Sequence, residues 1–97
     1  MQVKIHSVQF RADSKLESFI EDKLVKLNIY YDQIMGSEVY LKLENTNDPE
    51  NKITEIRLSI PGNDLFAKKQ SKTFEEATDQ AVEALRRQIQ KHKDKVK

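Results

Sequence analysis

Basic side chains are concentrated at the end of the chain, where their types and spacing suit the binding of phosphate groups. Residues 86–97 hold 6 bases and 1 acid, whereas residues 1–85 hold 11 bases and 15 acids. Lysine and arginine clustered in this way bind nucleic-acid phosphates without reading sequence. Because the net charge is only +1, we predict a local polyanion-binding surface. Its candidate residues are Arg86, Arg87, Lys91, Lys93, Lys95 and Lys97.

These bases fall within a predicted helix that runs from Thr73 to Lys97. Thr73 is followed three residues later by Glu76, which is typical of a capping box. Acids come first along this helix and bases last, an order that suits the helix dipole. The dipole and solubility together are an alternative explanation of these charges, but the dipole effect fades within about one turn. The predicted apolar stripe is Phe74, Ala77, Ala81, Val82, Leu85 and Ile89.

A first helix and four strands are predicted before this segment. Asp13 or Ser14 can cap the first helix, with Glu17 available to complete a box from Ser14. Its apolar stripe comprises Leu16, Phe19, Ile20, Leu24 and Leu27. Alternation of apolar and polar residues predicts strands at about 2–8, 37–44, 53–60 and 65–71. The intervening connections are expected at 28–36 and 45–51, with a hairpin turn at 61–64.

The predicted order is β-α-β-β-β-α, in one domain that spans residues 1–97. Short loops indicate that the last three strands form an antiparallel meander, whereas the helix after the first strand prevents a hairpin there. Each helix has one apolar face, so both must cover the same face of the sheet. We therefore expect an α+β two-layer sandwich with a four-stranded sheet. Its open face should carry polar residues such as Tyr40, Lys42 and Arg57.

Two lysines of the first helix are candidates to extend the basic surface. Lys23 and Lys26 are three residues apart and share one helical face, although such a pair is also ordinary on a solvated helix. Tyr30 and Tyr31 follow, and adjacent tyrosines can stack on bases. The favoured interpretation is that one of them packs on the core edge and the other lies at the surface.

Residues for other chemistries are absent or scattered. The chain has no cysteine, which excludes a disulfide, a thiolate nucleophile and a cysteine-ligated zinc. Its two glycines form no phosphate loop, and nothing pairs His6 with His92 as metal ligands. His6 is expected to face solvent or to be hydrogen-bonded on its strand. We expect no catalytic residue, metal, cofactor or small-molecule substrate, and therefore no enzyme.

The sequence contains no long apolar run and no signal peptide. We therefore expect a cytoplasmic protein without a membrane partner.

Four segments resemble one protein family in order and spacing. MQVKI (1–5) resembles the family's first strand, DKLVKL (22–27) with the following Tyr-Tyr-Asp resembles the end of its first helix, and EVYLKLE (38–44) resembles its second strand. The most specific match is LRRQIQKHKDK (85–95), which is similar to the family's C-terminal motif. On these segments the chain resembles the short form of ribosome hibernation promoting factors. That family is also known as ribosome-associated translation inhibitors or ribosomal subunit interface proteins.

The resemblance implies a fold like that of double-stranded RNA-binding domains and binding to the small ribosomal subunit. Family members occupy the channel between head and body, cover the A and P sites and exclude messenger and transfer RNA. The implied partners are 16S ribosomal RNA and neighbouring ribosomal proteins, with a monomer expected off the ribosome. Arg86 has no basic counterpart in the family and is included because it adjoins the others. The family's RNA-contacting positions correspond to Lys23, Lys26, Arg87, Lys91, Lys93 and Lys95.

The chain departs from the family pattern at the start of its second helix and in one loop. Thr73, Phe74 and Glu75 stand where the family usually has an aspartate, an apolar residue and a tyrosine, so no contact by that tyrosine is implied. The loop 45–51 is longer and more polar than in many members. We expect no C-terminal domain of the kind that pairs two ribosomes in the long form.

Two alternative functions stay open at this point. One is a protein-interaction module, which uses the open sheet face or an edge strand and agrees with the description of this family as modulators of sigma 54. The other is a generic binder of double-stranded RNA.

Overall fold

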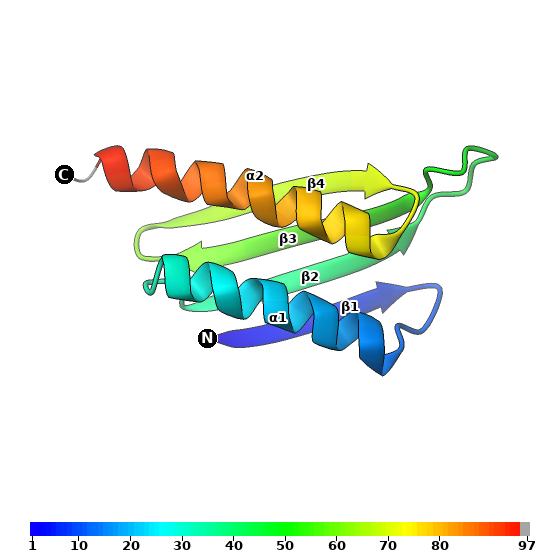
Figure 1. Ribbon diagram of the computed structural model, residues 1–97, viewed down its shortest axis with the longest axis horizontal. Coiled ribbons are helices and arrows are strands. Elements are labelled where there is room, and N and C mark those ends of the chain that lie inside the picture. The colour runs from blue at the N-terminus through cyan, green and yellow to red at the C-terminus, as the bar shows by residue number, and fades with distance from the viewer. Residues whose placement is uncertain (96–97) are drawn as a thin grey trace.

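Six elements follow one another in the order that the sequence predicts, β-α-β-β-β-α (Figure 1). The computed structural model describes residues 1–95, so Lys97 and the end of the predicted second helix lie outside the described residues. The elements are β1 (Gln2–Val8), α1 (Ser14–Tyr30), β2 (Gly36–Leu43), β3 (Lys52–Ile60), β4 (Asn63–Ser71) and α2 (Phe74–Lys95).

The four strands form one sheet in the order β1-β2-β3-β4. β1 pairs with β2 in parallel, with Ile5 opposite Val39, and the β2–β3 and β3–β4 pairs are antiparallel. The predicted meander of the last three strands is therefore confirmed. The sequence excluded a β1–β2 hairpin without placing β1. The structure shows that α1 is a crossover that returns the chain to run parallel to β1, as such pairs require.

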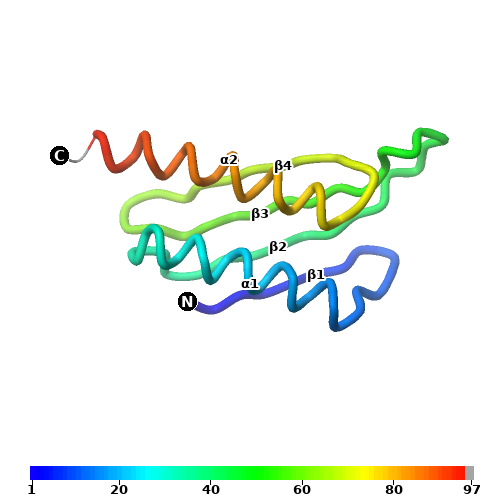
Figure 2. The backbone as a smooth tube through the Cα atoms, in the orientation of Figure 1, coloured from blue at the N-terminus to red at the C-terminus, as the bar shows by residue number. Residues whose placement is uncertain are grey.

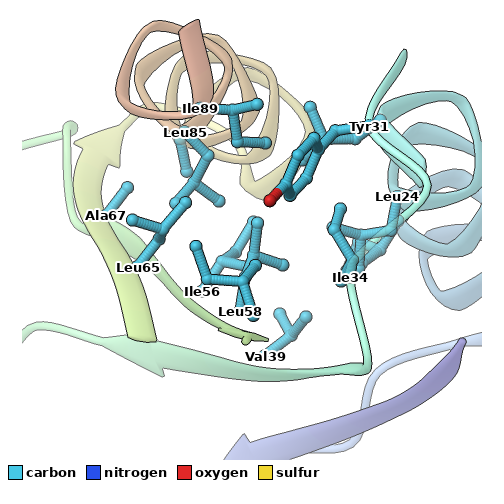
Figure 3. Close-up of a cluster of buried hydrophobic side chains, with 14 of the residues drawn as sticks. Leu24, Tyr31, Ile34, Val39, Ile56, Leu58, Leu65, Ala67, Leu85 and Ile89 are labelled. Atoms are coloured by element: carbon cyan, nitrogen blue, oxygen red, sulfur yellow. The ribbon is translucent and has the colours of Figure 1, made fainter. Parts of the chain in front are cut away.

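Both helices lie on the same face of the sheet, side by side and running in the same direction (Figures 1 and 2). The predicted two-layer sandwich is thus confirmed. Ile20 and Leu24 of α1 and Leu85 of α2 are fully buried. These side chains pack with the inner residues of the sheet in one core, where Figure 3 shows Leu24 and Leu85. Burying one such side chain stabilises a fold by about 1.5–3 kcal/mol.

Side-chain caps begin both helices. Asp13 Oδ1 accepts a 2.8 Å hydrogen bond from the Leu16 amide, so Asp13 is the cap of α1 and Ser14 is its first helical residue. The alternative box from Ser14 is therefore not the one used. Thr73 Oγ1 accepts a 3.0 Å hydrogen bond from the Glu76 amide, which is one of the two hydrogen bonds of the predicted capping box.

The first helix is longer than the sequence predicts. The expected connection at 28–36 is wrong at its start, because α1 continues to Tyr30. The Tyr31 amide still donates to the Leu27 carbonyl at 2.9 Å, and the Tyr31 side chain is buried. Its ring points into the core between the helices (Figure 3). Tertiary packing of Tyr31 therefore holds the last turn of α1 in place.

The β3–β4 hairpin is tighter than the predicted four-residue turn. Ile60 pairs with Asn63, which leaves only Pro61 and Gly62 in the loop. Gly62 has φ +78°, a value that a type II turn requires at its second central residue, after a proline at the first. β4 consequently begins at Asn63, two residues before the predicted start.

Candidate nucleic-acid interface

Three of the predicted basic residues meet between the two helices. Lys23 and Lys26 of α1 and Arg86 of α2 line one hollow of about 210 Å³, which we call the groove. Apolar atoms of Leu27 and Val82 also line it. The family pattern provided no counterpart for Arg86, yet this side chain is the one that α2 places opposite the α1 lysines.

Two acidic residues share the groove with these bases. Asp79 and Glu83 also line it, and Lys23 Nζ lies 2.9 Å from Asp79 Oδ1. One of the predicted phosphate ligands is therefore already paired across the two helices. From the sequence these acids were assigned to the helix dipole, because nothing local in the sequence places Asp79 beside Lys23.

Tyr30 connects the end of α1 to α2. Arg86 Cζ and Lys93 Nζ each lie 4.6 Å from the centroid of its ring, within the range of cation–π attraction. Its hydroxyl donates a hydrogen bond to Gln90 Oε1. Arg86, Gln90 and Lys93 are spaced i, i+4, i+7 and therefore form one stripe along α2, which we call the inner stripe. Tyr30 holds all three of its members.

The remaining predicted residues form a second stripe on α2. Arg87, Lys91 and Lys95 are spaced i, i+4, i+8 and are all exposed; we call them the outer stripe. Arg87 lines a hollow with Lys69 of β4. Lys91 and Lys95 line another hollow beside the start of β4. The outer stripe thus faces solvent and the β4 edge, whereas the inner stripe faces α1.

Two acidic side chains, which we call the acidic ridge, lie between the groove and Arg87 of the outer stripe. Asp79 and Glu83 line both the groove and the hollow beside Arg87. Arg87 Nε lies 3.9 Å from Glu83 Oε1, a long contact between two exposed side chains that contributes little to stability. Of the eight predicted residues, the seven within residues 1–95 all lie on the helix layer, and the ridge divides the groove from Arg87.

The two adjacent tyrosines have different environments, as the favoured interpretation predicted. Tyr31 is 9% exposed and packs in the core, with its ring edge-on to His92 at 6.2 Å between centroids. Tyr30 is only partly buried and lies at the surface between the helices. The sequence analysis left a role for Tyr30 open, because its α2 partner Gln90 is 60 residues away in the chain.

The open face of the sheet carries its own polar network. His6 is exposed there and stacks on Tyr40 at 4.8 Å between centroids, and Lys42 Nζ lies 2.9 Å from Glu55 Oε2. The Tyr40 hydroxyl donates a 2.8 Å hydrogen bond to Glu38 Oε2. This hydrogen bond raises the pKa of Tyr40 above its ordinary value, and desolvation and the charge of Glu38 act in the same direction.

A side chain of α2 protects the β4 edge. Gln88 Nε2 donates a 2.8 Å hydrogen bond to the backbone carbonyl of Phe66. An incoming strand would find this acceptor already in use, and the exposed Lys68 and Lys69 also discourage pairing at the edge.

The described part of the chain offers neither a metal site nor a membrane span. Residues 1–95 contain no group of three or more His, Cys, Asp or Glu side chains placed to hold a metal ion. Over the same residues, no helix combines the length and the apolar character needed to cross a bilayer.

Relatives of known name match the chain along its whole length. The ribosome hibernation promoting factor of Escherichia coli (strain K12) is 30% identical over 97 residues, which are 100% of this chain and 98% of that protein. The factor of the same name from Pseudomonas putida is 30% identical over 95 residues, 98% of this chain and 89% of the relative. The ribosome hibernation promotion factor of Bacillus subtilis is 32% identical, but the chain spans only 50% of its length.

Solved structures show the same fold. A ribosomal subunit interface protein from Coxiella burnetii superposes with a TM-score of 0.86 at 19% identity, over 97% of this chain and 99% of that one. The N-terminal domain of Thermus thermophilus Protein Y gives 0.81 at 22% identity, over 95% and 99% of the two chains. The family model described as Sigma 54 modulation protein / S30EA ribosomal protein matches residues 3–97, and the chain belongs to this family.

Proposed function

We propose that this protein is a non-enzymatic translation inhibitor of the cytoplasm. It binds the small ribosomal subunit in the decoding channel and excludes messenger and transfer RNA during stress or stationary phase. The names of the Escherichia coli and Pseudomonas putida relatives support a role in ribosome hibernation. The observation that carries RNA binding is the groove, where Lys23 and Lys26 of one helix face Arg86 of the other.

The proposed mechanism is electrostatic occupancy. The groove, the inner stripe and the outer stripe contact phosphates of 16S ribosomal RNA and release counterions, which provides affinity without base recognition. Tyr30 keeps Arg86 and Lys93 in place before RNA arrives, so less side-chain freedom is lost on binding. Inhibition follows because two polymers cannot occupy one channel.

The acidic ridge supports selectivity for a shaped partner. Asp79 and Glu83 lie between the groove and Arg87, where a phosphate placed on the ridge would be repelled. Only an RNA surface whose phosphates avoid the ridge gains contacts on both sides of it. Folded ribosomal RNA is recognised in this way by shape, whereas a flexible polyanion has no matching gap.

Binding to purified small subunits tests the proposal directly. The wild-type chain is expected to co-sediment with them and to block subsequent binding of messenger RNA. The triple substitution R87E/K91E/K95E should abolish co-sedimentation while circular dichroism stays unchanged. Unaltered co-sedimentation of this variant would remove the outer stripe from the interface.

Free duplex RNA as a competitor separates the generic RNA binder from the ribosome-specific one. A ribosome-specific protein should stay bound to small ribosomal subunits in the presence of a large excess of duplex RNA. Displacement at equal phosphate concentration would instead favour the generic binder.

A protein-interaction module is the second candidate. The description of the family by sigma 54 modulation favours it, as does Phe66, which is 45% exposed on the open sheet face. A pull-down that survives nuclease treatment and contains a sigma factor without ribosomal proteins would support this candidate. The Gln88 contact at the β4 edge argues against strand addition there.

A further inference from the structure

A further hollow lies at the end of the molecule where α1 stops and α2 passes the β3–β4 hairpin (Figure 1). Its volume is about 690 Å³, more than three times the 210 Å³ of the groove. We call it the end hollow. Its apolar and aromatic lining residues are Ile29, Tyr30, Tyr31, Pro61 and His92, and its polar ones are Asp32, Gln33 and Lys93.

The end hollow is unusual in what it exposes. Ile29 is 78% exposed although it follows the buried Leu27 on the same helix. Single exposed apolar residues are common on protein surfaces. Here the isoleucine shares one hollow with Tyr30 and the exposed Pro61, so apolar and aromatic side chains line a concave surface together with a few polar groups, as in ligand sites.

The end hollow is joined to the groove through one residue. Tyr30 lines both, and Arg86 and Lys93 lie over its ring. A ligand with an apolar, planar part and a linked anionic part can therefore occupy both sites at once. A nucleotide of an RNA strand has this composition, with a base on one side and phosphates on the other.

We propose that the end hollow seats one unpaired base of the RNA partner, whose adjacent phosphates lie on Arg86 and Lys93. This inference rests on the proposed binding to ribosomal RNA and adds a base contact to it. Bases within a duplex are stacked and paired, so only a nucleotide from a loop, bulge or strand end can enter. The site needs no particular base, because every base has a π-face and an apolar pocket accepts each of them.

The absence of cysteine from the chain provides a specific test. A short photo-crosslinker can be attached to the single thiol of I29C and the labelled protein bound to small subunits. The matched control is V8C, since Val8 is also exposed but lies on β1. The I29C adduct should crosslink to an unpaired nucleotide of 16S ribosomal RNA, mapped by primer extension, and the V8C adduct should not.

The crosslink also decides between RNA and protein as the occupant. The labelled I29C protein could sediment with the subunit but crosslink only to ribosomal protein, only to paired nucleotides, or to nothing. Any of these results would show that the end hollow does not bind an unpaired base. The proposed function then still stands, because binding is measured in the same sample. If the wild-type chain does not sediment with subunits at all, the proposed function and this inference fail together.

An affinity measurement gives an independent readout. The probe is a single-stranded RNA oligomer of mixed sequence, compared with an oligomer of the same charge in which the bases are missing. The wild-type chain should prefer the oligomer with bases by about fivefold or more, as expected for one stacked base. I29S should lose most of this preference. V25S should keep it, because Val25 is exposed one turn earlier on α1, outside the end hollow.

Equal affinity of the wild-type chain for the two oligomers would overturn the base seat. A preference that survives in I29S, or that V25S loses to the same extent, would show that the bases bind elsewhere.

Discussion

The two faces of this sheet hold basic side chains in different ways. On the open face, Lys42 lies 2.9 Å from Glu55, whose side chain is only 15% exposed, and Glu38 accepts a hydrogen bond from Tyr40. On the helix layer, Lys23 is also paired with an acid, Asp79, and Arg87 lies 3.9 Å from Glu83. Arg86 and Lys93, by contrast, lie over the uncharged ring of Tyr30. Within residues 1–95, neither Lys91 nor Lys95 forms an ion pair.

This difference shows why the net charge of +1 says little about binding. A lysine paired with a carboxylate must give up that contact before it can bind a phosphate, so little free energy is gained. A cation held by an aromatic ring keeps its full charge and its hydrogen-bond donors for an incoming anion. We therefore expect ring-held Arg86 and Lys93 to be more available to a polyanion than the acid-paired Lys23 and Lys42.

The largest difference in small-subunit affinity is expected when three bases are neutralised on one face or on the other. R87Q/K91Q/K95Q on the outer stripe is expected to weaken small-subunit binding on the order of hundredfold, because three phosphate contacts are lost. K4Q/R57Q/K68Q on the open face, also three exposed bases, should change it by less than about twofold if no phosphate contacts are made there. Equal losses in an equilibrium sedimentation assay would place RNA on both faces.

The salt dependence of the same variants measures how many phosphates each face contacts. The slope of log affinity against log salt should decrease by roughly 2–3 in the outer-stripe triplet. The open-face triplet should keep the wild-type slope. A wild-type affinity that does not change with salt would contradict an electrostatic interface altogether.

Removing the Tyr30 ring should leave the Arg86 and Lys93 side chains without the contact that fixes their positions. Y30L keeps an apolar side chain at the position but loses both ring contacts and the hydrogen bond to Gln90. Subunit affinity is expected to decrease by about five- to tenfold, in keeping with cation–π contacts of roughly 0.5–1 kcal/mol each. Y30F should recover most of the loss, because the ring rather than the hydroxyl holds Arg86 and Lys93. If Y30F and Y30L bind equally weakly, the hydroxyl is the important group.

Removing an acid from the groove should make the helix layer bind RNA more tightly and leave the open face unchanged. D79N releases Lys23 from its 2.9 Å pair and should raise the affinity for generic duplex RNA by about three- to fivefold at low salt. The free energy of unfolding should change by less than about 1 kcal/mol, because the pair is partly exposed. E75Q, an exposed acid in the first turn of the same helix, is the control. An unchanged duplex affinity in D79N would mean that the ridge does not limit binding.

The smallest effect is expected on the open face. The hydrogen bond to Glu38 raises the pKa of Tyr40 above 10.0. The associated stabilisation is therefore present below pH 10 and is lost as the pH rises through the raised pKa. E38Q should lower the Tyr40 pKa in an ultraviolet titration and leave subunit binding unchanged. Weaker binding by E38Q at neutral pH would involve this face in the interface.

The fold was predictable because its signals are local. The period-two alternation around Val39 and Ile56 and the helical spacing of Leu85 and Ile89 each indicate an element and its buried face. The end of α1 was not predictable in this way. Asn28 and Ile29 are only moderate helix formers, and the last turn depends on Tyr31, which packs against segments distant in sequence.

The candidate site was predictable as a region of the chain but not as a set of facing residues. Successive residues on a helix point about 100° apart, so Arg86 and Arg87 face different surroundings. Which of them lies opposite Lys23 depends on how α2 is rotated against α1. That rotation is set by the packing of the core, and no short segment of sequence encodes it.

The shared direction of the two helices has a consequence for how the molecule meets its partner. Both carboxyl ends point toward one end of a body that is 46 Å long (Figure 2), and the lysines of α2 lie there. The acidic first turn of α2, with Glu75 and Glu76, lies at the other end. The protein is thus a permanent electric dipole along its long axis. In the field of a polyanion it should rotate before contact, so that it arrives with its lysine-rich end leading and its encounter rate decreases as salt is added.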